Sequence, residues 1–299
     1  MTTKLEDRDW NLLLGRIKDG KCTPILGEDI HNETVPRYIK TSRKWAEESN
    51  YPISGAEEDL AKVSQFLSVY HDPMYPKEEL LKELKPIPPP DFTIPDEPHG
   101  VLADLPVPIF LTTNYNSYLE LALKSRQKTP RKEICRWNET VKHHESIFDS
   151  DAAFEPTVSN PVVFHLYGND TSAESLVLTE DDYLDYLVHI SKDDKIVPSR
   201  IQRALASTSL MILGYTLGDW SFKVLFRGLI SGRHSRMNRI SVTVQLPPVS
   251  DDPEDPKQQR LQKYFDDYFG GAGIRAYWGT TKEFIIELRQ RWRDFGDGN

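Results

Sequence analysis

Short apolar runs rich in β-branched residues alternate along this chain with longer segments of helical periodicity. Chains that alternate in this way form parallel, doubly wound α/β sheets, in which each helix returns the chain to the same end of the sheet. The predicted strands cover residues 22–27, 107–114, 161–168, 209–213, 240–246 and 274–278. The predicted helices cover residues 6–19, 36–50, 56–71, 117–125, 220–230 and 258–269, one that begins after Thr179, and a last one at the C-terminal end. We therefore predict a Rossmann-like, mainly parallel sheet with a helical insertion.

The insertion is expected between the first two strands. Residues 36–98 contain two helical segments, a short helix and the proline-rich stretch KPIPPPDFTIPDEP. Proline lacks a backbone N–H and interrupts regular structure, so this stretch is predicted to be a loop. We predict one domain over residues 1–299, with residues 36–98 as a helical and Pro-rich insertion within it.

Composition excludes several classes of protein. The net charge is −9 over 299 residues, whereas a nucleic-acid-binding surface needs a basic footprint, so no direct nucleic-acid partner is expected. No apolar run approaches the roughly 20 residues that cross a bilayer, and the first residues are charged, so we expect a cytoplasmic protein that does not enter the membrane. The chain has two cysteines, Cys22 and Cys135, which cannot form a four-thiolate zinc site. No metal is expected.

Four predicted strands end in polar or glycine-containing turns, and the segments that form these ends are ILG (to Gly27), TTN (to Asn114), FHLYG (to Gly168) and LGY (to Tyr215). Ligands of doubly wound sheets bind beyond the carboxyl ends of the strands. The second of these turns contains two hydroxyls and two amides, in the order Thr112, Thr113, Asn114, Tyr115, Asn116. One amide is explained by capping the helix that follows, with Asn116 at the N-cap. Paired amides also suit a carboxamide or ribose hydroxyls, because each offers a donor and an acceptor.

His165 lies near the end of an apolar strand, three residues before Gly168. One interpretation is a core histidine whose ring is satisfied by a backbone carbonyl. The other is a general base beside a sugar hydroxyl, since imidazole titrates near neutral pH. The expected proximity of Asn114 favours the second interpretation, and Gly168 permits close approach of the backbone.

Two glycine turns are candidate phosphate loops. Gly214 and Gly218 stand between a strand and a helix, with Asp219 at the start of that helix, where main-chain N–H groups can bind an anion. Gly27 follows the first strand, but Glu28 and Asp29 come next, and two carboxylates repel a phosphate.

Four segments together resemble the bacterial sirtuin-like domain, a group known from antiphage defence effectors that destroy NAD. They are TTNYN (112–116), FHLYG (164–168), LVLTEDDYLDYL (176–187) and LMILGYTLGDWSFKVLFRGL (210–229), and the resemblance extends over about residues 20–290. It implies a Rossmann-type NAD fold in which Asn114 holds the nicotinamide ribose and a water and His165 supports the chemistry. It also implies that Gly214 and its neighbours lie near the adenosine half. The residues that we expect to bind NAD are Gly27, Thr112, Thr113, Asn116, Gly168, Gly214, Tyr215 and Asp219.

The sequence departs from the sirtuin pattern in three places. The zinc ribbon of protein-deacetylating sirtuins is absent, which argues against acyl-peptide substrates. The usual Asp two residues after the Asn is Asn116, which still binds a carboxamide but gives less electrostatic help to a cationic transition state. The usual Gly-Ala-Gly loop reads Gly-Glu-Asp at Gly27.

These features lead to two functional hypotheses of different class. The first is an NAD+ glycohydrolase, an antiviral abortive-infection effector that consumes NAD as its substrate and is controlled by homo-oligomer assembly, by a separate defence sensor protein, or by both. Release of residues 86–98 would then open the site. The second is a catalytically weak or dead module that binds NAD or ADP-ribose or scaffolds a complex, which Glu28 and Asp29 favour.

Overall fold

The structure, a computed structural model, describes residues 5–31, 37–193, 195–215, 220–225, 241–245, 256–270 and 273–297. Its centre is a seven-stranded sheet with the order β3-β4-β2-β1-β5-β6-β7, and every neighbouring pair is parallel. The strands are β1 (Cys22–Leu26), β2 (Ile109–Thr112), β3 (Arg131–Ile134), β4 (Val162–His165), β5 (Ser209–Leu213), β6 (Ser241–Gln245) and β7 (Ile274–Trp278). This confirms the predicted Rossmann-like parallel fold.

Side chains alternate between the two faces of each strand, and each face has its own apolar core. Phe110, Val163 and Met211 belong to one cluster, while their neighbours Leu111, Phe164 and Ile212 belong to the other. The first face is covered by α1 (Asp7–Lys18), α5 (Pro98–Asp104), α6 (Tyr118–Ser125) and α12 (Thr281–Asp297). The second is covered by α8 (Glu180–Lys192), α9 (Ser199–Ser207), α10 (Trp220–Leu225) and α11 (Pro256–Gly270).

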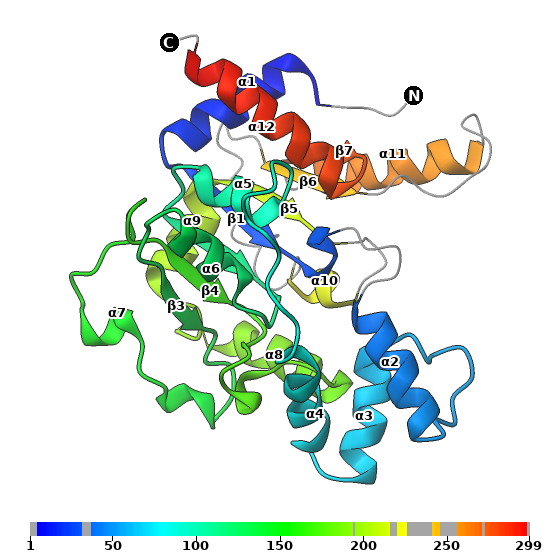
Figure 1. Cartoon of the computed structure of the whole chain (residues 1–299). Coiled ribbons are helices and arrows are strands. Elements are labelled where there is room, and N and C mark those ends of the chain that lie inside the picture. The colour runs from blue at the N-terminus through cyan, green and yellow to red at the C-terminus, as the bar shows by residue number, and fades with distance from the viewer. Residues whose placement is uncertain are drawn as a thin grey trace.

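Helices α2 (Arg37–Glu48), α3 (Leu60–Tyr70) and α4 (Tyr75–Leu84) lie between β1 and β2 in the chain and pack together at one end of the molecule (Figure 1). Helices α1 and α12 lie side by side at the opposite end. Short helical turns complete the fold: η1 (Glu28–His31), η2 (Val141–His143), α7 (Ile147–Ser150) and η3 (Ala173–Ser175). The division into one domain with an insertion over residues 36–98 stays a prediction.

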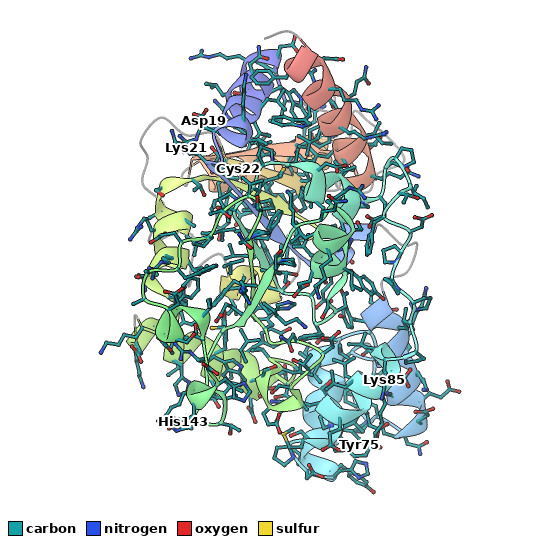
Figure 2. All side chains as sticks on the ribbon, turned by 60° about the vertical axis from the view of Figure 1, so that its left-hand side comes forward. Asp19, Lys21, Cys22, Tyr75, Lys85 and His143 are labelled. Carbon is teal, nitrogen blue, oxygen red and sulfur yellow. The ribbon has the colours of Figure 1, made fainter. Side chains whose placement is uncertain are left out.

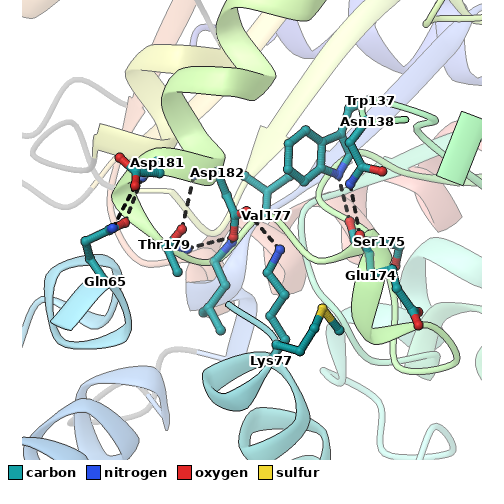
Figure 3. Close-up of polar contacts among 12 residues, drawn as sticks. Gln65, Lys77, Trp137, Asn138, Glu174, Ser175, Val177, Thr179, Asp181 and Asp182 are labelled. Atoms are coloured by element: carbon teal, nitrogen blue, oxygen red, sulfur yellow. Dashed lines mark hydrogen bonds and ion pairs between the residues drawn. The ribbon is translucent and has the colours of Figure 1, made fainter. Parts of the chain in front are cut away.

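The α2–α4 helices are joined to α8 by two polar contacts (Figure 3). Nζ of Lys77 on α4 lies 2.8 Å from Oδ1 of Asp182, and both side chains are largely buried. The amide of Gln65 on α3 donates to Asp181 and its oxygen accepts from the Asp181 main-chain N–H. Asp182 also completes a capping box with Thr179, which confirms the predicted N-cap of this helix. One carboxylate therefore both starts α8 and holds α4.

Cys22 lies at the start of β1, just after Asp19 and Lys21, and far from the end of the molecule where Tyr75 and Lys85 lie (Figure 2). Both cysteines are free and buried, as expected of small apolar side chains. Helices within the described ranges are too short or too polar to cross a bilayer.

Strand β3, helix α5 and the short helical turns η1, η2, α7 and η3 were not predicted. Strand β3 reads RKEI, and its polarity hides it because it is an edge strand with one side open to solvent. Helix α5 begins at Pro98, the last residue of the proline-rich stretch that was predicted to be a loop. Helix α9 was predicted only at its end. The helix predicted over 220–230 is described as far as Leu225, so its last residues lie outside the described ranges.

Candidate functional site

The four strands whose ends were predicted to hold a ligand are consecutive in the sheet. β4, β2, β1 and β5 lie side by side, and because they are parallel, their carboxyl ends meet at one edge. The chain adds β2 to one side of β1 and later adds β5 to the other side. The topological switch point, where doubly wound folds bind their ligands, is therefore between β1 and β5.

Asn114 lies two residues after the end of β2 and is held by hydrogen bonds to three different parts of the chain. Its main-chain N–H donates to Oγ1 of Thr112 at 2.9 Å, and its carboxamide nitrogen donates to the carbonyl of Gly27 at 3.0 Å. Nδ1 of His165 lies 3.1 Å from its main-chain oxygen. Within the described part of the chain no group donates to the carboxamide oxygen, so that acceptor is left for a ligand or water. Both the main chain and the side chain of Asn114 are fixed.

Thr112, Thr113 and Tyr215 converge on one carbonyl at the end of β1. The oxygen of Leu26 accepts from the Thr113 main-chain N–H at 2.9 Å, the Tyr215 hydroxyl at 3.1 Å and Oγ1 of Thr112 at 3.2 Å. The hydroxyls of Thr113 and Tyr215 lie 3.0 Å apart. All three side chains are buried. These hydrogen bonds tie the ends of β1, β2 and β5 together.

Gly27 and Gly214 lock the switch point. Gly214 has a φ of 74°, a left-handed conformation that favours glycine, and its carbonyl accepts from the Asp29 main-chain N–H at 3.0 Å. The Gly27 N–H donates to Leu213 at 2.8 Å. The N–H groups of Gly27 and Asp29 are therefore used inside the protein.

Gly168 and Asn116 lie beside this network, with local contacts of their own. Gly168 has a φ of 82°, and a Cβ atom there would approach the carbonyl oxygen of Ser175 to 2.2 Å, so the predicted close approach of backbone occurs against η3. The oxygen of the Asn116 carboxamide accepts from the Tyr118 N–H at 3.1 Å, whereas the N-cap position of α6 is Ser117. The prediction that Asn116 occupies the N-cap is therefore wrong by one residue, although its side chain accepts from an N–H of the first turn of α6. Asp219 lies outside the described residues.

His165 ends β4 opposite Thr112 in the sheet register, and its ring is fully buried. Nε2 lies 2.7 Å from Oε1 of Glu120, on α6, and Nδ1 faces the Asn114 carbonyl. Burial raises the pKa of Glu120, but the charge of His165 and its hydrogen bond outweigh burial, so the pKa of this carboxyl is lowered overall. The structure matches the first interpretation of His165, because its ring is fully buried and faces the Asn114 carbonyl, with the Glu120 carboxylate as a second partner, and the role of general base stays a prediction.

Sequence reasoning missed Glu120. The available signal was a carboxylate inside the apolar pattern of α6, next to Leu119 and one turn before Leu123, both of which are buried. A charge on the buried face of an amphipathic helix needs a partner. Period-two alternation also places His165 on the same face as Val163, which is the face that α6 covers. The two observations together could have paired Glu120 with His165.

The charge of Glu28, the residue after Gly27, affects three buried tyrosines. Burial raises the pKa of Tyr115, Tyr167 and Tyr183 well above the usual range, and the nearby Glu28 carboxylate raises all three further. The Tyr115 hydroxyl donates to the Val177 carbonyl at 2.7 Å. A dianionic pyrophosphate beside the Glu28 carboxylate would be repelled unless this loop moved. No group of three or more potential metal ligands occurs in the ranges that the structure describes.

The fold and these strand-end side chains define a Rossmann-like protein with a polar site at the carboxyl edge of its sheet. Comparison with known protein families shows that the chain belongs to the SIR2-like domain family, whose profile matches residues 108–269. The matched region contains Asn114, Glu120, His165 and Gly214.

Two curated proteins are similar to part of the chain. The NAD(+) hydrolase ThsA of Enterococcus faecium is 26% identical over 125 residues, which cover 41% of this chain and 22% of that protein. The NAD(+) hydrolase ThsA of Acinetobacter baumannii (strain 532279) is 25% identical over 125 residues, 42% of this chain and 22% of that protein. The similarity thus covers less than a quarter of the length of either relative. It supports an NAD-related, sirtuin-like function.

Proposed function

We propose that this protein is an NAD+ glycohydrolase that releases nicotinamide and ADP-ribose, and that it acts as an antiviral abortive-infection effector. The observation that carries the proposal is the way Asn114 is held. Hydrogen bonds from three sides fix it at the carboxyl edge of the sheet, with the carboxamide oxygen free of donors in the described residues. The SIR2-like family match and the names of both relatives support the same chemistry.

In the proposed reaction the N-glycosidic bond between nicotinamide and ribose breaks, and its electron pair leaves with nicotinamide. The ribosyl carbon becomes oxocarbenium-like and is captured by water, whose second proton passes to solvent or to a protein base. Asn114 holds the ribose and the attacking water through its carboxamide, and Asn116 faces the carboxamide of nicotinamide. A positioned water supplies much of the rate, because the entropy of bringing it to the reacting carbon has already been lost.

His165 is proposed to support this chemistry from behind Asn114. Both of its ring nitrogens face protein acceptors. As long as these hydrogen bonds persist, His165 acts through its contact with Asn114. Gly27, Thr112, Thr113, Gly168, Gly214, Tyr215 and Asp219 are proposed to line the rest of the NAD site. An active NADase is toxic to its own cell, so we propose control by homo-oligomer assembly or by a separate sensor protein.

The test is nicotinamide release from NAD by the purified wild-type protein, Asn114→Ala and His165→Ala. Loss of release in both variants, with folding retained by circular dichroism, is the expected result. Activity is measured over a wide range of protein concentration, because control by assembly predicts that specific activity rises with concentration. Full release by Asn114→Ala would contradict the proposal.

A second candidate is a module that binds NAD or ADP-ribose without turnover. The carboxylate of Glu28 favours this candidate. This carboxylate lies near the buried tyrosines on the side where a phosphate would be expected. Under this alternative NAD raises the melting temperature of the wild type but no nicotinamide is released. Glu28→Ala would then strengthen NAD binding without creating activity.

A further inference from the structure

Glu120 and His165 form an ion pair inside the protein, away from solvent. Oε1 and Nε2 are 2.7 Å apart, and the side chains of the histidine and the glutamate are 0% and 5% exposed. The partners come from different elements, since His165 ends β4 and Glu120 lies on α6. A charged pair in such surroundings is costly to desolvate and is weak evidence for added stability, so its presence calls for another explanation.

The hydrogen-bond partners define the protons on the ring. The main-chain oxygen of Asn114 can only accept, so Nδ1 must carry a hydrogen for that contact to be a hydrogen bond. An ionised Glu120 can also only accept, so Nε2 must carry a hydrogen as well. With both nitrogens protonated, His165 is an imidazolium paired with a carboxylate. The lowered pKa of Glu120 agrees with this assignment.

Each member of the pair depends on the other. Oε2 of Glu120 is buried and has no hydrogen-bond partner in the described structure, so the contact with His165 is the hydrogen bond that satisfies this carboxylate. The other charged group that acts on Glu120 is Lys132 on β3, whose ammonium donates to Oγ of Ser117 at 2.7 Å and lies 3.5 Å from Asp170. Removing His165 alone therefore leaves a buried carboxylate without a side-chain hydrogen-bond donor among the described residues.

We propose that Glu120 is a positioning residue that holds His165 as an imidazolium and, through its Nδ1–H, fixes the main chain of Asn114. The role rests on the proposed NAD hydrolysis, because Asn114 is the residue that would touch the substrate. The atoms of a residue that holds a ligand must stay within about 0.5 Å of their productive positions. A neighbouring side chain that is itself fixed by packing and hydrogen bonds provides this precision. The pair has no net charge, so it holds Asn114 without opposing the cationic ribosyl centre.

The first test reads the protons directly and does not depend on turnover. Imidazole nitrogens of the full-length protein labelled with 15N-histidine are followed by NMR, and the His165 signals are assigned by their loss in His165→Gln. In the wild type at pH 7 both nitrogens are expected to be protonated. In Glu120→Gln, which keeps the shape but removes the charge, one nitrogen is expected to lose its proton. A neutral ring in the wild type, or an unchanged ring in Glu120→Gln, overturns the proposal.

The chain offers a matched control in Glu97 and His99. This second buried pair has Oε1 and Nδ1 2.9 Å apart, and it lies at the start of α5. Glu97→Gln removes the same kind of charge from the same kind of pair. It is expected to change the His99 signals and to leave those of His165 unchanged. Equal changes in the His165 signals of the two variants would mean that Glu120 acts only through general stability.

The second test is kinetic and uses the wild-type protein, Glu120→Gln and Glu120→Asp. Partners that orient a functional histidine typically change activity by about tenfold to a hundredfold, so kcat in Glu120→Gln is expected to fall by that factor with KM for NAD little changed. Glu120→Asp keeps the charge and is expected to recover part of the loss. A change in KM alone would overturn the positioning role. If the wild type releases no nicotinamide, the proposed function fails and the NMR result still decides how Glu120 acts on His165.

A third measurement separates mutual dependence from simple loss of packing. His165→Gln is expected to destabilise the protein in urea more than the double variant Glu120→Gln, His165→Gln does, since the double variant leaves no buried charge without a partner. If the double variant is less stable by the sum of the two single effects, the two side chains do not act as a pair.

Discussion

The carbonyl oxygen of Gly214 lies 2.3 Å from the position that a Cβ atom on Gly27 would occupy. The ring of Tyr215 is also closer than 3 Å to that position, at 2.7 Å. The turns after β1 and β5 are thus in direct backbone contact at the switch point of the sheet. Any side chain at Gly27 must push these two turns apart.

Gly27→Ala is therefore expected to destabilise the protein by about 1–3 kcal/mol, the range of overpacked interiors, and to weaken NAD binding. The obstacle is a backbone oxygen that cannot rotate away. The matched control is Gly15→Ala in α1, where a Cβ atom would meet nothing within 4 Å. In a helix this exchange is favourable by up to about 1 kcal/mol. Urea unfolding followed by circular dichroism measures both, and equal stabilities of the two variants would contradict the described contact.

The position of the site could be predicted from the sequence because strand ends are local features. An apolar run followed by amides or glycine indicates where a strand stops, and parallel pairing brings these ends to one edge. The contact between Gly27 and Gly214 could not be predicted, because it depends on β5 lying directly beside β1 although 182 residues separate them in the chain. The local sequence pattern does not predict that these two strands are neighbours in the sheet.

The partner of His165 illustrates a second limit. The sequence places His165 at a strand end but gives no direct indication that Glu120, 45 positions earlier, packs against its ring.

Strand β3 was missed for a different reason. Its residues RKEI are polar because it lies at the edge of the sheet, where one side needs no apolar cover. Patterns of hydrophobicity detect buried strands and overlook such edges.

The stability of the protein in acid is expected to depend on Glu120. Its pKa is lowered in the folded state, so it adds stability above the ordinary value of 4.5, and this stability is lost as the pH falls through the lower folded value. Glu120→Gln should therefore be less stable than the wild type at pH 7, with a difference that shrinks below about pH 4. Urea midpoints at a series of pH values measure this difference.

Glu133 on β3 serves as the control of opposite sign. Burial raises the pKa of this carboxyl, which accepts a hydrogen bond from the Ile147 N–H at 2.7 Å. A raised carboxyl pKa costs stability once the pH exceeds the unfolded value, so Glu133→Gln should be more stable than the wild type at pH 7 and equal to it near pH 4. The same sign of effect in Glu120→Gln and Glu133→Gln at pH 7 would be inconsistent with these assignments.

Both cysteines are expected to be unreactive in the native protein. Burial raises the pKa of the Cys22 and Cys135 thiols to about 12. At pH 8 only about one thiol in ten thousand is then ionised, and the thiolate is the reactive form. A chromogenic disulfide reagent should therefore detect almost no thiol at pH 8 until guanidinium is added, when both react. Rapid reaction of either thiol without denaturant would show that the region around it opens.

The contact between Lys77 and Asp182 is expected to decide whether the α2–α4 helices stay docked on α8. The pair is largely buried, with side-chain exposures of 8% and 13%, and the ammonium also lies 5.6 Å from the centre of the Trp137 ring. Lys77→Met keeps the length of the side chain but leaves the carboxylate without its counter-charge, which costs about 1–3 kcal/mol.

Lys82→Met is the matched control, because Lys82 pairs with Glu79 on the same helix while 67% exposed, and exposed pairs contribute at most about 1 kcal/mol. Asp182 keeps its hydrogen bonds from the main-chain N–H groups of Leu178 and Thr179, so α8 itself should persist in Lys77→Met. Faster proteolysis within residues 37–84 in Lys77→Met, but not in Lys82→Met, is the expected sign of undocking, whereas identical cleavage of both variants would mean that apolar packing alone holds these helices.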